Sequence, residues 1–216
     1  MERIVFGAML LCLPLIALSA DESILGTHWV KFQPVQIAGE IQGCQLTFLT
    51  VTKDRVYLSG NDVAVNGSIV LQTTERGLGI LLKVGLKDLT SPSATFERPA
   101  FAYLQTAAGS TAKSKQQSTD GDPGYKLFVY SATDSDAMKV LTDLITSGKA
   151  TIGYNRKIGG MDVLVPLDLM VADSDYTKNQ KVIRTRSPVE ANGFAECTNR
   201  VISRVLDDLK KTEKKK

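Results

Sequence analysis

The fold is decided most clearly by the stretch GCQLTFLTV, residues 43–51. Successive side chains of a strand point to opposite sides, so Cys44, Leu46 and Phe48 share one face of an extended chain. The residues between them fall on the other face. This alternation predicts a strand over 43–51 that directs one apolar face toward a core.

A second alternating stretch, Ile80 to Leu86, predicts another half-buried strand. Shorter strands are predicted along the rest of the chain: 29–35, 56–58, 63–65, 68–72, 101–105, 125–131, 149–155 and 163–169. Pro34 is expected to end the first of these, and Asn66-Gly67 is expected to form a hairpin turn between two others. The polar segment 172–186 is expected to be rich in turns, with a short basic strand over 181–186.

Two helices are predicted in the C-terminal half of the chain. The first begins near Thr133 and ends at Gly148, because apolar residues recur between them at helical spacing: Ala137, Met138, Leu141, Leu144 and Ile145. The second is indicated by SPVE at 187–190, which combines a capping serine, a proline at the first helical position and a glutamate at the third. Gly193 weakens its first turns, so the regular helix is expected to begin near Phe194. Its apolar stripe comprises Phe194, Cys197, Val201, Val205 and Leu209.

These elements predict a mainly β fold, either an antiparallel β-sandwich or a strongly twisted sheet, with two packed α-helices. The strands are too closely spaced for helical crossovers over most of the chain. Residues 106–124 read TAAGSTAKSKQQSTDGDPG, and the absence of any apolar side chain larger than alanine predicts a long exposed loop. We expect a single domain over 21–209 that contains this loop, followed by a basic tail over 210–216.

Composition places the chain among ordinary globular proteins. Its 216 residues are 43% hydrophobic and 23% charged, which excludes wholesale disorder, a collagen and a coiled coil. The net charge of +3 is too small to identify a class of partner.

The first twenty residues have the pattern of a secretory signal peptide. They read MERIVFGAMLLCLPLIALSA, with one basic residue, an apolar run and small residues before a cleavage site that we place after Ala20. The apolar run is short for a membrane span, and no later stretch is long and apolar enough to cross a bilayer. Cys12 lacks the small preceding residues of a lipoprotein signal and is expected to leave with the peptide. The mature protein is therefore expected to be periplasmic or secreted.

Cleavage would leave two cysteines, Cys44 and Cys197. An oxidising compartment and an even count favour a disulfide between them, which would join the early strand to the last helix. Two alternatives remain, a pair of inert buried thiols and a reactive thiol. Redox pairs are usually close in sequence, which these two cysteines are not.

The residues that usually carry catalysis or metal binding are scarce. His28, the one histidine, is interpreted as a surface or strand-end residue, and no nucleophile motif accompanies it. Ser110 and Lys113 match the serine acylase pattern S-x-x-K but lie in the predicted loop. Asp173 and Asp175 begin a calcium-loop pattern that the following residues do not complete. No catalytic residue, metal or cofactor is predicted, and no phosphate-binding loop is present in the sequence.

Basic residues near the C-terminus are a candidate surface for an anionic partner. They are Lys181, Arg184, Arg186, Arg200 and Arg204, with further lysines in the tail. The functional interpretation is contact with anionic envelope components or an acidic protein, and the alternative is a solvated face with a solubilising tail. Nucleic acid is not an expected partner, because export argues against it.

The segment from Met138 to Cys197 suggests a family. It runs as a helix (MKVLTDLITSGK), a strand (ATIGYNR), a turn at Gly159-Gly160, a strand (VLVPLDL) and a late helix. In this order it resembles the C-terminal half of the bacterial invasion-associated locus B family, which comprises small exported β-rich proteins with disulfides. It is also similar to periplasmic accessory proteins of type VI secretion. The Gly-Phe that usually follows the last strand in the first family is absent here. The resemblance implies an exported, non-catalytic β protein and transfers no site residue.

The sequence therefore predicts an exported non-catalytic protein that binds a protein or an envelope component, in host interaction or envelope assembly. One alternative is an inhibitor of an envelope-attacking enzyme, whose active site the 106–124 loop would enter. The other is a hydrolase with a carboxylate site, because spacing in the sequence does not reveal such pairs.

Overall fold

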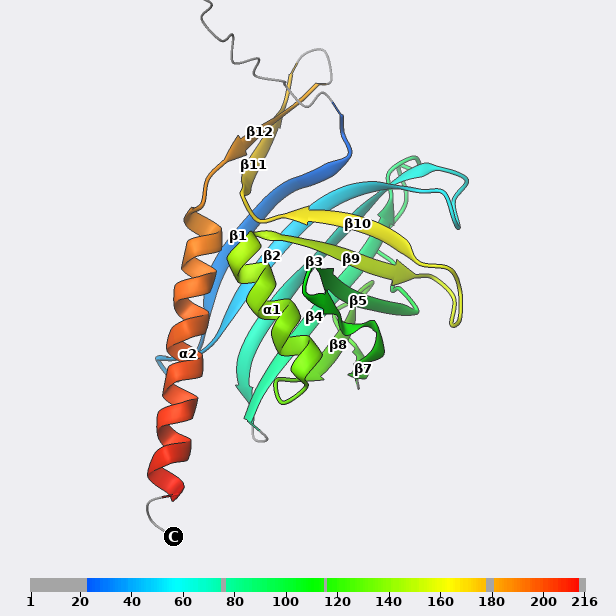
Figure 1. The fold of residues 1–216 in the computed structure, drawn as a ribbon. Helices are drawn as coiled ribbons and strands as arrows, with labels where there is room; N and C mark the ends of the chain where they lie inside the picture. Colours follow the sequence, from blue (N-terminus) through cyan, green and yellow to red (C-terminus); the bar gives the residue numbers. More distant parts are fainter. Residues whose placement is uncertain (1–22, 75–76, 115, 178–180, 214–216) are drawn as a thin grey trace, which may run out of the picture.

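The computed structural model describes residues 23–74, 77–114, 116–177 and 181–213 (Figure 1). The predicted signal peptide and Lys214 to Lys216 lie outside the described residues. The strands are β1 (Gly26–Ile37), β2 (Glu40–Asp54), β3 (Asn61–Thr74), β4 (Gly77–Asp88), β5 (Phe101–Thr106), β6 (Gly109–Ser110), β7 (Gln116–Asp120), β8 (Lys126–Ser131), β9 (Lys149–Asn155), β10 (Val163–Asp168), β11 (Val171–Tyr176) and β12 (Val182–Arg186). The helices are α1 (Ser135–Ser147) and α2 (Val189–Glu213), with a short 3-10 turn η1 (Thr111–Lys113).

The strands form antiparallel sheets, which confirms the predicted fold class. A six-stranded sheet has the order β1-β2-β3-β4-β8-β7, and a four-stranded sheet has the order β10-β9-β5-β6. Strands β11 and β12 form a hairpin that projects at the top of Figure 1. Helix α2 runs along the β1 side of the molecule, with α1 between it and the small sheet (Figure 1).

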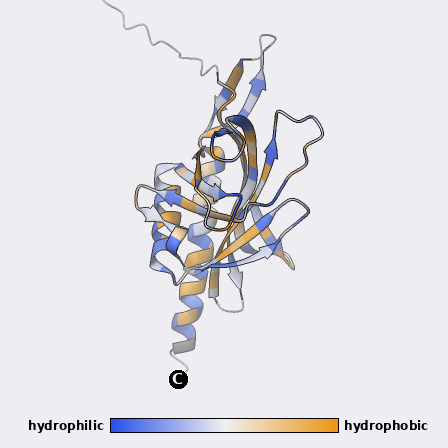
Figure 2. Ribbon diagram, turned by 90° about the vertical axis from the view of Figure 1, so that its right-hand side faces the viewer, coloured by the Kyte–Doolittle hydropathy of each residue, from blue (hydrophilic) through white to orange (hydrophobic). Residues whose placement is uncertain are grey.

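The core lies between the two larger sheets and is closed by the helices. Apolar and polar residues alternate along many of the strands (Figure 2). Polar contacts tie the sheets together, because the Thr50 hydroxyl donates to the Pro166 carbonyl at 2.9 Å and the buried Tyr130 hydroxyl donates to the Ala102 carbonyl at 3.1 Å. The buried apolar side chains on the inner faces include Cys44, Leu46, Phe48, Ile80, Leu82, Val84, Leu86, Ile152, Tyr154, Val163, Val165 and Leu167.

The first four strands are longer than the sequence predicts, and the hairpin predicted at Asn66-Gly67 is wrong. Both residues lie inside the 14-residue strand β3, paired with β2 and β4. The Asn66 amide donates to the Phe48 carbonyl at 2.8 Å and accepts from the Tyr125 hydroxyl at 2.9 Å. These side-chain partners hold an asparagine that would otherwise favour a turn, so tertiary contacts override the local signal.

Pro34 does not end the first strand, contrary to the prediction. Strand β1 continues to Ile37, with Pro34 opposite Cys44. Because β1 is the edge strand of its sheet, Pro34 can lie in it without removing a ladder hydrogen bond.

Helix α1 agrees closely with the prediction. Asp134 caps its first turn, since the carboxylate accepts from the backbone N–H groups of Asp136 and Ala137. Gly148 ends it in the left-handed conformation, with φ of 67°. The buried residues on its inner face are Ala137, Val140, Leu141 and Leu144.

Helix α2 begins earlier than predicted and extends further. It starts at Val189, whose backbone N–H donates to the Ser187 hydroxyl at 3.3 Å. A Cβ atom at Gly193 would lie 2.6 Å from the ring of Phe32, so this glycine lets the helix lie close against β1. The helix continues to Glu213, so the first part of the predicted 210–216 tail is helical.

The predicted long loop 106–124 is exposed but contains regular structure. Strand β7 pairs with β8 at the edge of the larger sheet. The Thr111 side chain is buried and accepts from the Leu104 backbone N–H at 3.0 Å. The prediction of a loop is therefore wrong over β6, η1 and β7. Polar residues can form a strand at the edge of a sheet, as in β7, because an edge strand pairs with one neighbour and leaves its other side in solvent.

Candidate functional site

The predicted disulfide is present between Cys44 on β2 and Cys197 on α2. The two Cα atoms are 5.9 Å apart, and the bond links residues separated by 153 positions. Both cysteines are buried in the core, so the bond acts as a structural link between helix and sheet. This pairing excludes the alternatives of inert or reactive free thiols.

The basic residues of the β11–β12 hairpin have structural contacts. The Arg184 guanidinium donates to the backbone carbonyls of Thr27, Leu25 and Ser23 at 2.7, 2.6 and 3.1 Å, and so fixes the chain that leads into β1. The Arg186 guanidinium lies 2.8 Å from the Asp168 carboxylate. Lys181 is exposed at the start of the strand.

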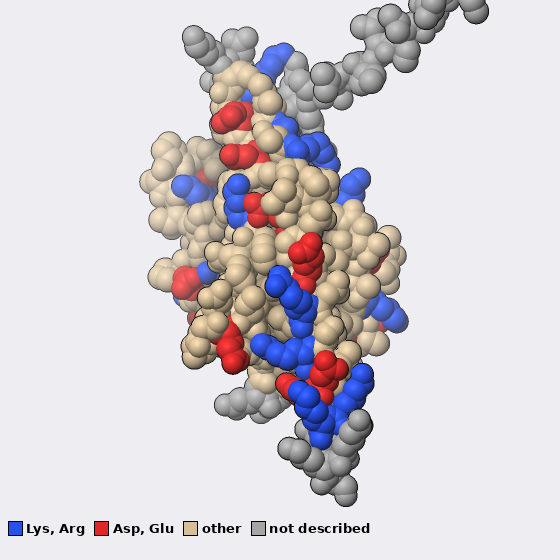
Figure 3. Space-filling model, turned by 90° about the vertical axis from the view of Figure 1, so that its left-hand side faces the viewer, with Lys and Arg blue, Asp and Glu red and all other residues tan. Residues whose placement is uncertain are grey.

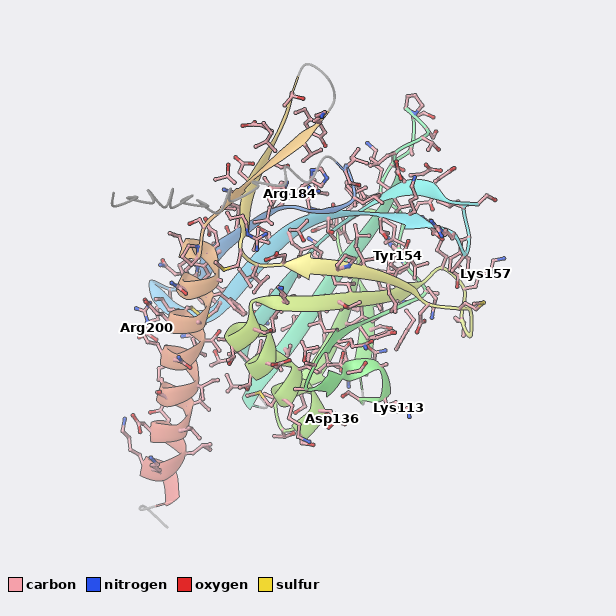
Figure 4. The ribbon with its side chains drawn as sticks, turned by 45° about the horizontal axis from the view of Figure 1, so that its top comes forward. Lys113, Asp136, Tyr154, Lys157, Arg184 and Arg200 are labelled. Atoms are coloured by element: carbon pink, nitrogen blue, oxygen red, sulfur yellow. A yellow bond between two sulfur atoms is a disulfide. The ribbon has the colours of Figure 1, made fainter. Side chains whose placement is uncertain are left out.

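Arg200 and Arg204 lie on α2, apart from Arg184 (Figure 4). They line a shallow hollow with Ile41 and Val201, and Arg204 donates to the Gln42 side chain at 3.1 Å. On this side of the molecule, acidic residues are interspersed with the basic ones (Figure 3). The five predicted basic residues therefore divide between the hairpin and the helix.

His28 lies near the beginning of β1, as a strand-end residue would, but it is buried, so its interpretation as a surface residue is wrong. Its side chain lies under the β11–β12 hairpin, with Nε2 2.7 Å from the Ile24 carbonyl and Nδ1 3.0 Å from the Ser174 hydroxyl. A carbonyl only accepts, so Nε2 carries the proton and Nδ1 accepts from Ser174. Burial lowers the pKa of His28, and the nearby Arg184 charge lowers it further.

The most unusual surface is at the end of the molecule opposite α2. There the connection between β2 and β3 meets the connection between β9 and β10, and Lys157 lies at this end (Figure 4). Ile158 is 95% exposed, Met161 is 73% exposed and Val56 is 40% exposed. Arg55 and Lys157 are exposed next to them in the sequence. We call these five residues the tip surface.

A hydrogen bond between the two connections holds the tip surface together. The Tyr57 hydroxyl donates to the Met161 carbonyl at 2.6 Å. A Cβ atom at Gly160 would lie 2.3 Å from the Tyr57 hydroxyl, so only glycine fits beside the ring. The apolar side chains of the two connections are thus presented together by a defined contact.

Beneath the tip surface, the fully buried Asp54 carboxylate organises a polar network. It accepts from the backbone N–H groups of Val56 and Tyr57 at 3.1 and 2.8 Å. It also accepts from the Tyr154 hydroxyl and the Arg156 guanidinium, both at 3.1 Å. Arg156 forms a second ion pair with Glu97 at 3.0 Å. The network pairs the buried charge and anchors both connections.

A second carboxylate, Asp162, stabilises the other side of the β9–β10 connection. It accepts from the Tyr103 hydroxyl at 2.9 Å and from the Asn155 amide at 3.1 Å. Burial, followed by the Asp162 contact, raises the pKa of Tyr103 to about 12. Burial and the Asp54 charge likewise raise the pKa of Tyr154. Both phenols remain protonated donors at neutral pH.

The chemistry of these groups is structural. The Asp54 carboxylate is fully buried and accepts internal hydrogen bonds, so it is not presented to a substrate as a general base or nucleophile. The Asp162 carboxylate is exposed and accepts from Tyr103 and Asn155. The hydrolase hypothesis gains no support from this cluster. The Ser110 hydroxyl, part of the S-x-x-K match, accepts from the Ala112 backbone N–H at 3.1 Å and caps η1.

Within 23–74, 77–114, 116–177 and 181–213, no group of three or more His, Cys, Asp or Glu side chains is placed to hold a metal ion. In the same part of the chain, no helix has the length and apolar character needed to span a bilayer. The predicted calcium-like pattern at Asp173 and Asp175 lies on β11, and its residues 178–180 fall outside the described part.

An open groove of about 580 Å³ crosses the outer face of the smaller sheet. Its lining includes Gln105, Lys149, Thr151, Pro166 and Asp168, from β5, β9 and β10. These side chains are polar or small, and the groove is wide. It offers less distinctive chemistry than the tip surface.

Sequence reasoning missed the tip surface, although one signal was present. The sequence predicts a turn at Gly159 and Gly160, which the structure contains, and turns are normally polar. The isoleucine and methionine that flank these glycines are therefore unexpected in such a turn. The contribution of Val56 was hidden, because residues 56–58 were predicted to form a strand and instead form the connection after β2.

Comparison of the chain with models of protein families, with curated proteins and with solved structures yields no match.

Proposed function

We propose that this protein is an exported, non-catalytic binding protein whose contact with an envelope component is made by the tip surface. Its placement in the periplasm or outside the cell is part of the proposal. The Cys44–Cys197 disulfide supports it, because such bonds persist in oxidising compartments. The resemblance to exported β-rich families stays a prediction.

The observation that carries the proposal is the exposure of Ile158 and Met161 on connections that hydrogen bonds hold in place. Isolated exposed apolar side chains are ordinary, but neighbouring ones on adjoining connections mark interaction surfaces. The buried Asp54 network gives these connections a fixed form. A preorganised contact surface loses less conformational entropy when it binds.

Sedimentation with bacterial envelope fragments tests this function. The exported protein is incubated with fragments, and the pelleted fraction is compared with that of the double variant Ile158→Asn, Met161→Asn. Loss of apolar contact predicts about a tenfold weaker association for the double variant. The matched control is Ile183→Asn, Leu206→Asn, which alters two residues that are 54% and 51% exposed elsewhere on the molecule.

The control variant is expected to sediment like the wild-type protein. Equal sedimentation of the tip variant and the wild-type protein would contradict the proposed function. Circular dichroism and thermal unfolding of each variant establish that the fold is retained, so that a loss of binding is not a loss of structure.

A second candidate, an inhibitor of an envelope-attacking enzyme, is favoured by one observation. Part of the 106–124 segment is ordered, since Arg98 pairs with Asp120 of β7 at 2.6 Å and Ala108 donates its backbone N–H to Asp143 at 3.1 Å. Inhibitory loops gain affinity from such order. This function predicts that an Ala107→Trp change on the exposed β5–β6 turn abolishes inhibition of a peptidoglycan hydrolase, while the tip variant inhibits normally.

A further inference from the structure

We infer that the partner of the tip surface is a lipid bilayer that contains anionic phospholipid, entered shallowly by Val56, Ile158 and Met161. This inference rests on the proposed function, because it uses the same surface, and it names the partner. It assigns to Arg55 and Lys157 the role of contacting lipid phosphates.

The exposure of the apolar side chains favours insertion over docking in a rigid pocket. Ile158 is 95% exposed, so its side chain projects from the protein and has almost no neighbour beside it. A protein partner would need a cavity shaped to receive it. A fluid bilayer interface adapts to a projecting side chain and gains affinity in proportion to the apolar area that enters it.

The residue types also favour lipid over protein. The residues that contribute most of the binding energy in protein interfaces are enriched in tryptophan, tyrosine and arginine, and they lie in well-packed surroundings. The apolar residues of the tip surface are aliphatic, and the nearby Tyr57 hydroxyl is already bonded to the Met161 carbonyl. Three exposed apolar side chains also cover much less area than a stable protein interface of about 800 Å² on each partner.

The charges of the two connections suit an anionic surface. In the β9–β10 connection, Arg156 is paired with Asp54 and Glu97. The exposed Asp162 carboxylate accepts from the neutral Tyr103 and Asn155 and keeps its negative charge, which the two exposed basic residues of the tip surface outnumber. Arg55 and Lys157 are exposed directly beside Val56 and Ile158. Long basic side chains next to an inserted apolar residue can keep their charge at the level of the lipid headgroups.

Part of the backbone at the tip surface is hydrogen-bonded internally. The backbone N–H groups of Val56 and Tyr57 donate to the Asp54 carboxylate, and that of Gly160 donates to the Lys157 carbonyl at 2.9 Å. The Met161 carbonyl accepts from Tyr57. Unsatisfied backbone groups make insertion into lipid costly, and these internal bonds reduce that cost without any refolding.

Vesicle sedimentation tests the inference. The exported protein is mixed with vesicles of phosphatidylcholine alone or of phosphatidylcholine with phosphatidylglycerol, at low and at physiological salt. The wild-type protein is expected to bind the vesicles that contain phosphatidylglycerol, and the Ile158→Asn, Met161→Asn variant is expected to bind about tenfold less. Arg55→Gln with Lys157→Gln is expected to remove most of the preference for phosphatidylglycerol.

A tryptophan at position 158 gives an independent signal. The Ile158→Trp variant is expected to show a blue-shifted emission with phosphatidylglycerol vesicles, whereas Ile183→Trp is expected to show none. A wild-type protein that does not bind these vesicles, or a tip variant that binds them equally well, would overturn the lipid inference.

The two proposals can fail separately. If wild-type protein ignores pure lipid vesicles while the tip variant loses binding to envelope fragments, the lipid partner is wrong and the tip surface remains the contact. If the tip variant binds envelope fragments normally, the proposed function itself fails, and the lipid inference fails with it.

Discussion

His28 shows how a single residue links the hairpin to the rest of the molecule. In the neutral ring, Nε2 donates to Ile24 and Nδ1 accepts from Ser174, so both nitrogens have partners. Tyr176 stacks beside the ring at a centroid distance of 6.0 Å, and the positive Arg184 is close enough to lower the pKa. Protonation would therefore place a second positive charge in a largely dehydrated position.

Acidification is expected to destabilise the protein through His28. Because the folded state holds its pKa below the ordinary value of 6.5, the unfolded chain binds the proton first as the pH falls. The stabilising contribution is complete above 6.5 and declines as the pH falls from there through the folded-state pKa. Urea unfolding between about pH 7.5 and about pH 5.5 measures the slope.

His28→Asn is the control for this prediction. The chain has one histidine, so the variant should lose most of the pH dependence in this interval. An unchanged slope in the variant would show that other groups cause the dependence.

For single residues, the sequence predicted the pairing of the cysteines but not the burial of His28. It indicated correctly that the two cysteines pair, because an even cysteine count and a predicted oxidising compartment favour a disulfide. It indicated a surface or strand-end position for His28 and did not reveal its burial, since nothing local shows that the distant β11–β12 hairpin covers it. The hydrogen-bond partner Ser174 is 146 positions away.

Strand β3 is the element that departs most from its local signals. Gly67 allows the strand to pass close to β4, because a Cβ atom there would lie 1.9 Å from the Lys83 carbonyl oxygen and 2.9 Å from the Phe48 ring. The backbone oxygen cannot move away without disturbing the ladder. The Asn66-Gly67 pattern predicts a turn, whereas in the structure Gly67 allows β3 to pack closely against β4.

Gly67→Ala is therefore expected to lower the free energy of unfolding by about 2 kcal/mol or more, as overpacking does in well-packed interiors. Chemical denaturation measures the change. Ser118→Ala on the exposed strand β7 provides the comparison and is expected to alter stability by less than about 0.5 kcal/mol. Equal stability of the Gly67→Ala variant and the wild type would show that the strands can separate at low cost.

In helix α2, the capping motif predicts the position of the first turn but not the contact that its glutamate makes. Ser187 caps the first turn as predicted, but the Glu190 carboxylate accepts from the Phe32 backbone N–H at 2.6 Å. The glutamate thus fixes the helix to β1. A local capping motif located the helix correctly, and a tertiary contact set the role of its third residue.

The whole molecule depends on one covalent link between its early and late parts. Cys44 and Cys197 join β2 to α2 across 153 positions, and chain entropy predicts a large effect for so long a loop. The link also holds the edge of the larger sheet, because α2 packs on β1 and β2.

The double variant Cys44→Ala, Cys197→Ala is expected to lose about 3–5 kcal/mol of unfolding free energy. Denaturant unfolding of the variant, compared with wild type with and without reductant, measures this loss. Reduction of the wild-type protein should lower the midpoint in the same direction. Wild-type protein whose two thiols react freely without reductant would contradict both the bond and the exported state.

The sequence alone determined the β-rich class and the two helices, because strand alternation and helix caps are local properties. It favoured the pairing of the cysteines through their even count and the predicted export, and the structure confirmed the bond. Tertiary structure alone decided the tip surface and the network below it. Tyr57 and Met161 are 104 positions apart, and Asp54 and Tyr154 are 100 apart. Each of these pairs comes together because the two sheets pack on each other, and a local pattern of side chains does not predict that packing.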